Sequence, residues 1–136
     1  MIARFSALRP LTFVIAVLMM AAAFTLDVQT AQAKCCLITI ANTTDCDFEA
    51  ILATDYTKEY IKVHAGVKNQ FKIPDCGNWT VYVYDACTGQ YTPFTYGSCG
   101  DVRLNRACCV NLCNDGYDPC TLIVTYGRCH HCYLVD

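Results

Sequence analysis

Twelve cysteines constrain this chain more than any other feature of its sequence. All of them lie between residues 35 and 132, where about one residue in eight is cysteine. This density exceeds the roughly 8–10% that is typical of a disulfide scaffold in a short exported chain. Their spacing leaves the pairing open. We therefore expect a disulfide-stapled domain from an oxidising compartment. The cysteines are Cys35, Cys36, Cys46, Cys76, Cys87, Cys99, Cys108, Cys109, Cys113, Cys120, Cys129 and Cys132.

The amino-terminal segment has the three parts of a secretory signal peptide. Arg4 and Arg9 precede an uncharged apolar run over residues 11–26, and a small-x-small sequence ends the segment at Ala31 and Ala33. The apolar run is shorter than the roughly 20 residues that a membrane-spanning helix needs. The sequence thus predicts cleavage after Ala33 and no membrane insertion of the mature chain. We expect the product to be secreted, to the extracellular space, the periplasm or the cell surface.

One domain is expected after the predicted signal peptide, residues 1–33. It covers residues 34–136, a length typical of a single domain with a modest core. Residues 34–98 contain few cysteines and are expected to hold the main strands. Residues 99–136 contain seven cysteines, and we expect a disulfide-dense section with loops held by bridges rather than by burial. The net charge of the whole chain is −2, which favours neither nucleic acid nor an anionic membrane as a partner.

Alternation of apolar and polar residues predicts short β-strands throughout the domain. The alternating segments are rich in Val, Ile, Thr and Tyr, and turn residues such as Gly, Pro, Asn and Asp separate them. Six to eight strands at this spacing, without a helical pattern, predict a small disulfide-rich antiparallel β-sandwich, immunoglobulin-like in architecture. The clearest segments are 36–40, 46–52, 60–64, 70–73, 79–84 and 121–126.

Tyrosines cluster in the middle of the domain. The chain has nine tyrosines, and Tyr82, Tyr84, Tyr91 and Tyr96 come after Trp79 within one short stretch. Tyr82 and Tyr84 share the strand face opposite Trp79, so we expect them on the outside. Exposed tyrosines suit recognition because the ring offers a large contact area and the hydroxyl stays hydrated. The alternative interpretation is cross-strand aromatic pairing that only supports the sheet.

The sequence Cys129-His130-His131-Cys132 has two chemical interpretations. A Cys-x-x-Cys pair is typical of thiol–disulfide oxidoreductases, and the same side chains offer ligands for Zn²⁺ or copper. However, the motif lies four residues from the end of the sequence, where no helix can be placed after it to stabilise a thiolate. The favoured interpretation is structural, with the two cysteines bridging to different strands. No metal or other cofactor is expected.

Two pairs of adjacent cysteines, Cys35-Cys36 and Cys108-Cys109, send their side chains to opposite faces of a strand. Each cysteine should therefore have its own partner. Internal staples are the favoured interpretation. The alternative is that an outward cysteine, or the terminal strand itself, bonds a neighbouring subunit.

No catalytic residue is predicted, because Ser98 is the only serine after residue 33 and lies in no nucleophile motif. The leading hypothesis is a secreted non-enzymatic structural or interaction module, such as a self-assembling filament, matrix or surface subunit. Its partner would be itself or another extracellular protein. One alternative is a secreted binding effector with an inhibitor-like or toxin-like scaffold. The other is a thiol–disulfide oxidoreductase or metal binder that uses Cys129 and Cys132.

Overall fold

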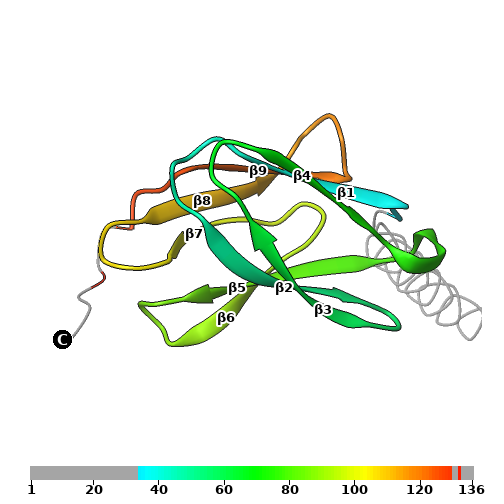
Figure 1. Cartoon of the computed structure of the whole chain (residues 1–136), viewed down its shortest axis with the longest axis horizontal. Coiled ribbons are helices and arrows are strands. Elements are labelled where there is room, and N and C mark those ends of the chain that lie inside the picture. Colours follow the sequence, from blue (N-terminus) through cyan, green and yellow to red (C-terminus); the bar gives the residue numbers. More distant parts are fainter. Residues whose placement is uncertain (1–33, 130–131, 133–136) are drawn as a thin grey trace, which may run out of the picture. The chain divides into compact units, whose positions relative to one another are not determined.

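Two β-sheets packed against each other form the domain (Figure 1). The computed structural model describes residues 34–129 and residue 132. The predicted signal peptide lies outside these residues. The described strands are β1 (Leu37–Asn42), β2 (Phe48–Thr54), β3 (Lys58–Val63), β4 (Lys68–Lys72), β5 (Trp79–Asp85), β6 (Gln90–Phe94), β7 (Cys99–Arg103), β8 (Cys109–Asn114) and β9 (Thr121–Tyr126), with a short 3₁₀ turn η2 (Pro74–Cys76) between β4 and β5.

The strand order confirms the predicted sandwich. One sheet has the order β4-β1-β9-β8-β7 and the other the order β3-β2-β5-β6. Neighbouring strands are antiparallel, with one difference from the expectation: β1 runs parallel to β9. The Thr39 N–H donates to the Cys120 carbonyl at 2.9 Å in this pair. Because β1 is hydrogen-bonded to β4 on its other side, the first strand is an interior strand and offers no free edge to a neighbouring subunit.

The period-2 pattern places side chains as the sequence predicts. On β5, Trp79, Val81 and Val83 are buried, whereas Tyr82 is half-buried and Tyr84 is exposed. Successive residues of a strand point to opposite faces, so one side of each sheet meets the core and the other meets solvent. The outer side of the β3-β2-β5-β6 sheet is therefore defined by Tyr82, Tyr84 and the residues beside them.

Residues after Cys99 also contribute to the core. Val102 of β7 and Val110 and Leu112 of β8 are fully buried, as are Leu122 and Val124 of β9. The sequence predicts a strand over residues 121–126, and β9 confirms it. For the rest of this section the expectation of loops held by bridges rather than by burial is wrong. The described residues from Cys99 onward form three strands that complete the first sheet, and burial of their branched side chains stabilises them as it does the rest.

Six disulfides pair all twelve cysteines within the chain, and no described cysteine is free. Each adjacent pair divides between two partners, as its alternation predicts. Only one of the six disulfides joins directly opposed residues of neighbouring strands. It connects Cys99 of β7 with Cys113 of β8. The disulfides are Cys35–Cys120, Cys36–Cys76, Cys46–Cys108, Cys87–Cys132, Cys99–Cys113 and Cys109–Cys129.

The disulfides indicate an oxidising environment, because thiols in the cytosol are kept reduced. Nowhere in residues 34–129 does the chain form a helix of the length and apolarity needed to cross a membrane. The disulfides fit the expected location outside the cytoplasm, and secretion itself stays a prediction.

Gly127 is expected to be intolerant of a side chain. A Cβ at this position would lie 2.7 Å from Cys109 Sγ and 2.8 Å from the Val110 carbonyl carbon. Gly127→Ala should therefore force the end of β9 away from β8 and lower the free energy of unfolding by about 2 kcal/mol. The measurement is urea unfolding followed by circular dichroism. Gly116→Ala is the matched control, because a Cβ there meets no atom within 4 Å; an equal cost for both variants would contradict the prediction.

Candidate binding face

Aromatic and apolar side chains line up across the outer side of the β3-β2-β5-β6 sheet. Tyr60 of β3 is the register partner of Ile51 on β2, Ile51 is the partner of Tyr82 on β5, and Tyr82 is the partner of Pro93 on β6. Directly opposed side chains on one face of a sheet are in contact range. A continuous row therefore crosses all four strands.

A second row lies beside the first and mixes charge with aromatic rings. Lys62 is the register partner of Glu49, and Tyr84 is the partner of Tyr91. The Tyr84 and Tyr91 rings pack edge to face, with centroids 5.5 Å apart and planes at 70°. This arrangement is a favourable one for an aromatic pair. We call Ile51, Tyr60, Tyr82, Tyr84 and Tyr91 the tyrosine face.

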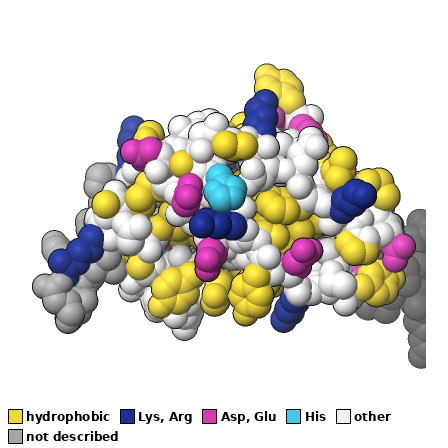
Figure 2. Space-filling model, viewed as in Figure 1, with side chains coloured by type: hydrophobic (Ala, Val, Ile, Leu, Met, Phe, Trp, Pro, Cys, Tyr) yellow, Lys and Arg dark blue, Asp and Glu magenta, His cyan; other side chains and the backbone are white. Residues whose placement is uncertain are grey.

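The tyrosine face is open to solvent. The exposed fraction is 79% for Tyr60 and 47% for both Tyr84 and Tyr91. Figure 2 shows hydrophobic side chains gathered along the margin of the molecule where this sheet lies, with charged groups of both signs between them. A sandwich sheet facing only water would instead carry polar residues on its outer side, so this face is suited to contact.

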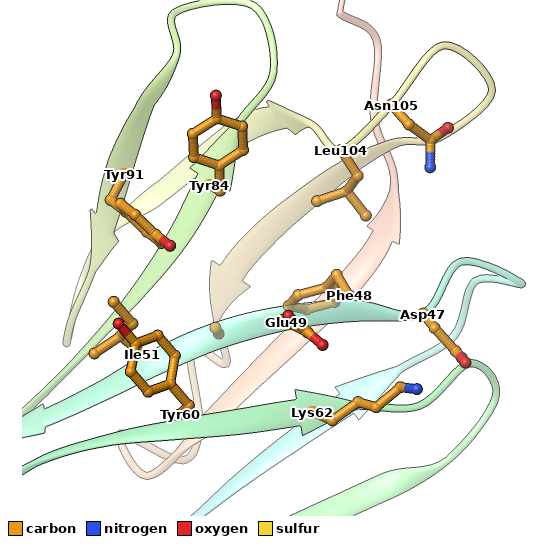
Figure 3. Close-up of a pocket in the computed structure, with 11 residues that line it drawn as sticks. Asp47, Phe48, Glu49, Ile51, Tyr60, Lys62, Tyr84, Tyr91, Leu104 and Asn105 are labelled. Carbon is orange, nitrogen blue, oxygen red and sulfur yellow. The ribbon is translucent and has the colours of Figure 1, made fainter.

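A trough of about 560 Å³ lies over part of the tyrosine face. Figure 3 shows Tyr60 on one side of it and Tyr84 and Tyr91 on the other, with Ile51 and Glu49 of β2 between them. Leu104 and Asn105, from the loop between β7 and β8, line its far end. The volume falls within the range of small-ligand pockets, about 300–1,000 Å³.

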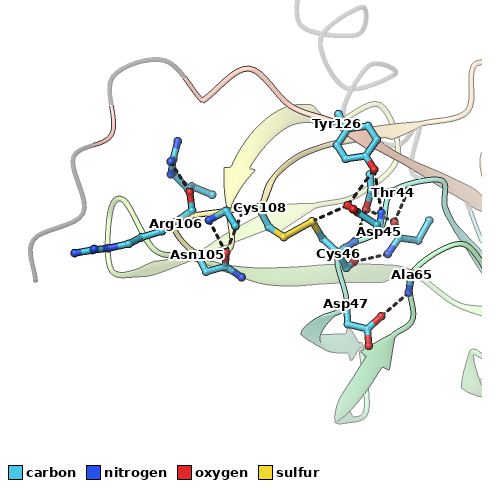
Figure 4. Close-up of a disulfide and its surroundings, with 12 residues drawn as sticks. Thr44, Asp45, Cys46, Asp47, Ala65, Asn105, Arg106, Cys108 and Tyr126 are labelled. Atoms are coloured by element: carbon cyan, nitrogen blue, oxygen red, sulfur yellow. Dashed lines mark hydrogen bonds between the residues drawn. A yellow bond between two sulfur atoms is a disulfide. The ribbon is translucent and has the colours of Figure 1, made fainter.

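A disulfide and a side-chain turn hold the loop that closes the trough. The Asn105 Oδ1 atom accepts hydrogen bonds from the Ala107 N–H at 2.8 Å and from the Cys108 N–H at 3.0 Å. Cys108 is joined to Cys46 just before β2 (Figure 4). The loop is thereby attached to the segment that leads into β2, the strand that forms the floor of the trough.

The charged side chains that line the trough differ in their hydrogen bonds and ion pairs. Asp47 accepts a hydrogen bond from the Ala65 N–H at 2.6 Å and lies 3.8 Å from His64 Nδ1. Figure 3 shows the Lys62 side chain directed toward the Asp47 end. Among the described residues, no ion pair or hydrogen bond engages the Glu49 carboxylate. Glu49 therefore supplies the uncommitted negative charge on the floor.

The structure brings together three of the four tyrosines predicted as an interaction surface. Tyr82, Tyr84 and Tyr91 lie on the tyrosine face, and Tyr84 and Tyr91 line the trough. Tyr96 lies in the turn after β6, exposed but away from the trough. Sequence reasoning missed Tyr60 as a member of this surface, although its alternation with buried Ile61 and Val63 indicated an outward side chain.

Asn105 and Glu49 also escaped sequence reasoning. Asn105 reaches the trough because of a disulfide that no local pattern predicts. Glu49 is conspicuous only after the register places it beside Lys62 and Tyr84.

The Cys-x-x-Cys segment does not close on itself. Cys129 is bonded to Cys109 and Cys132 to Cys87, so the two cysteines bridge to different parts of the domain, as the structural interpretation predicts. His130 and His131 lie outside the described residues. In this oxidised state neither sulfur is a thiolate that could attack a disulfide or bind a metal.

One group of potential metal ligands occurs in the described part of the chain. Ligand atoms of Asp101, Cys109 and Cys129 lie within 4.8 Å of one another. However, the two sulfurs belong to a single disulfide, and Asp101 accepts hydrogen bonds from Asn111 Nδ2 and the Arg128 N–H. The group is a bonded structural cluster rather than a metal centre.

The acidic turn between β8 and β9 has a structural explanation. Asp118 accepts hydrogen bonds from the Cys120 N–H at 2.9 Å and from the Thr121 hydroxyl at 2.7 Å. These two bonds favour the charged carboxylate and lower the pKa of Asp118 below that of a free aspartate. Hydrogen bonds within the turn therefore account for its acidic residue Asp118. The tyrosine face is the better candidate for a functional site.

Comparison with known proteins finds no match: no family model, no curated protein and no solved structure corresponds to this chain. The fold therefore rests on strand pairing and burial. The tyrosine face combines exposed aromatic rings with a trough and an uncommitted charge, and it is therefore the candidate functional site.

Proposed function

We propose that the domain is a secreted, non-enzymatic interaction module, and that its tyrosine face binds another extracellular protein. The observation that carries the proposal is the continuous row Tyr60–Ile51–Tyr82–Pro93, with the Tyr84–Tyr91 pair beside it. Tyrosine is enriched where proteins bind one another, because its ring is large, loses little entropy and keeps a polar end.

The scaffold supports this role. Binding costs less when the contact surface is already ordered, because fewer side chains and loops lose freedom on association. Here the aromatic residues lie on strands rather than on loops, and six disulfides restrain the sheets below them. A rigid sheet presenting aromatic side chains is a preorganised binding surface.

The sheet edges argue for contact through the face rather than through added strands. The edge strands of the second sheet are β3 and β6, and one edge of the first is β4. They carry Lys58 and Lys62, Pro93, and Lys68 and Lys72, respectively. Lysines and prolines on short edge strands oppose pairing with another chain. Strand addition at these three edges is therefore the less favoured form of self-assembly.

Photocrosslinking provides the test. A benzoylphenylalanine residue is placed at position 60 or 84 of the protein in the cell that exports it, and at position 117 as a control. Tyr117 is fully exposed but lies in the turn between β8 and β9. We expect a discrete adduct from positions 60 and 84 and none from 117. The mass of the adduct distinguishes another protein from a second copy.

Alanine variants provide the matching measurement. Tyr60→Ala with Tyr84→Ala should abolish the adduct formed from a probe at position 91, while changing the free energy of unfolding by about 1 kcal/mol or less, because both rings are exposed. Tyr96→Ala with Tyr117→Ala removes the same two side chains elsewhere and should leave the adduct intact. Equal adducts from positions 60, 84 and 117 would contradict the proposal.

A further inference from the structure

The trough combines two features that attract the same chemical group. Its floor carries the Glu49 carboxylate, which no described residue engages. Its sides carry the Tyr60, Tyr84 and Tyr91 rings. A carboxylate attracts a cation through charge, and the face of an aromatic ring attracts a cation through its quadrupole.

The apolar part of the floor narrows the choice of cation. Ile51 is the next residue after Glu49 on the same face of β2, and it is the register partner of Tyr60. A ligand along β2 would thus pass an aliphatic side chain and a ring before reaching the carboxylate. A long side chain with an apolar stem and a positively charged end would match this order, with the stem over the apolar groups and the charge at the carboxylate.

We propose that the trough binds an arginine side chain of the partner protein. The guanidinium would pair with Glu49 and stack on the Tyr84–Tyr91 pair, while the stem would lie over Ile51. Arginine fits better than lysine, because its planar group both stacks on rings and forms two parallel hydrogen bonds with a carboxylate. This inference rests on the proposed function, since it names the chemistry of the partner that the tyrosine face would hold.

Lys62 limits the cations that the trough would accept. Lys62 is the register partner of Glu49, but its side chain points toward the Asp47 end of the trough. A positive charge of the ligand would therefore be repelled by Lys62 at that end. The trough should therefore favour a single arginine with uncharged neighbours over a run of basic residues. Steric closure by Leu104 and Asn105 at the same end sets a limit on depth.

A peptide titration tests the inference directly. The secreted, disulfide-bonded protein is titrated with acetyl-Gly-Arg-Gly-amide and followed by nuclear magnetic resonance of its backbone amides. We expect saturable shifts confined to the residues around Glu49, Ile51, Tyr60 and Tyr84. The same peptide with citrulline, which keeps the shape but lacks the charge, should bind about tenfold more weakly. Equal affinity for the two peptides would overturn the inference.

Two matched variants distinguish a local effect of the Glu49 carboxylate from a long-range effect of the protein's charge. Glu49→Gln should weaken the arginine peptide about tenfold. Glu59→Gln removes the same charge from β3. Glu59 is next to Tyr60 in sequence, but its side chain lies on the opposite face of the strand. This variant should keep its affinity for the arginine peptide within about twofold of the unsubstituted protein. If both variants weaken binding equally, the effect is long-range charge and the inference fails.

Three further outcomes bear on the identity of the ligand and on the proposed function. Saturable shifts at the same residues with maltotriose or diacetylchitobiose, and none with the arginine peptide, would overturn the inference and assign the trough to a saccharide. Protein adducts from positions 60 and 84 that persist unchanged in the Glu49→Gln variant would leave the proposed function standing and overturn the arginine inference alone. Loss of those adducts in Glu49→Gln, but not in Glu59→Gln, would support both.

Discussion

Replacing Cys46 and Cys108 together by alanine should lower the free energy of unfolding by about 4 kcal/mol. The two cysteines are 62 residues apart in sequence, and their Cα atoms lie 6.1 Å apart. Cutting the bridge frees a long loop in the unfolded chain, and the stabilisation lost grows with the length of that loop. The bridge also links the start of β2 in one sheet to the start of β8 in the other.

A buried polar turn next to this bridge adds to the expected loss. Asn42 Nδ2 donates to the Cys46 carbonyl at 2.8 Å, and Asn42 Oδ1 accepts from the Thr44 N–H at 3.0 Å. Asn42 and Thr44 are both buried. When the bridge no longer holds Cys46, these hydrogen bonds are more easily broken, and an unpaired buried polar group costs about 1–3 kcal/mol.

The measurement is urea unfolding of the double variant beside a second double variant, Cys99→Ala with Cys113→Ala. That bridge spans 14 residues, so its removal should cost about 3 kcal/mol on the same entropic argument. The Cys46 and Cys108 variant should also lose affinity for the arginine peptide, because the bridge anchors the loop that carries Asn105. A smaller cost for the longer loop would contradict the loop-length argument.

Phe94→Ala is the second large expected effect, a loss of about 3–5 kcal/mol. The ring is 1% exposed although β6 is an edge strand. It reaches across to β7, where a Cβ at Gly100 would lie 3.6 Å from Phe94 Cε1. Deleting the ring removes contacts to both sheets and leaves a cavity between two edge strands, which can close only if the sheets shift.

Two variants provide the controls for this prediction. Phe94→Leu keeps most of the apolar volume and should cost less than half as much. Pro93→Ala changes the adjacent exposed residue of the same strand and should stay within about 0.5 kcal/mol of the unsubstituted protein. The interpretation would be wrong if Phe94→Ala and Pro93→Ala had the same midpoint in urea.

The candidate site could be predicted only in part. Tyr82 and Tyr84 alternate with Val81 and Val83, so local pattern alone places them outward. The local pattern does not predict which strands lie beside these tyrosines, because strand pairing joins residues that are far apart in sequence. The strand order β3-β2-β5-β6 is needed to place Tyr60 on one edge strand of this sheet and Tyr91 on the other.

Strands β7 and β8 show where local pattern is weak. Val102 is the single fully buried residue of β7, and cysteines and asparagines alternate with Val110 and Leu112 in β8. Such short runs carry little periodic signal, and the cysteine density favours a loop interpretation. Burial between two sheets makes these segments strands, because their backbone groups must be hydrogen-bonded once water is excluded.

The sequence by itself determined the fold class, the direction in which each alternating side chain points and the separate partners of adjacent cysteines. These properties depend on neighbours within a few residues. Tertiary structure alone decided the six disulfide pairs, the parallel pairing of β1 with β9, and the meeting of Glu49, Tyr60 and Asn105 around one trough. These depend on contacts between distant residues, and in a chain with this many cysteines many pairings satisfy the same local pattern until the two sheets pack.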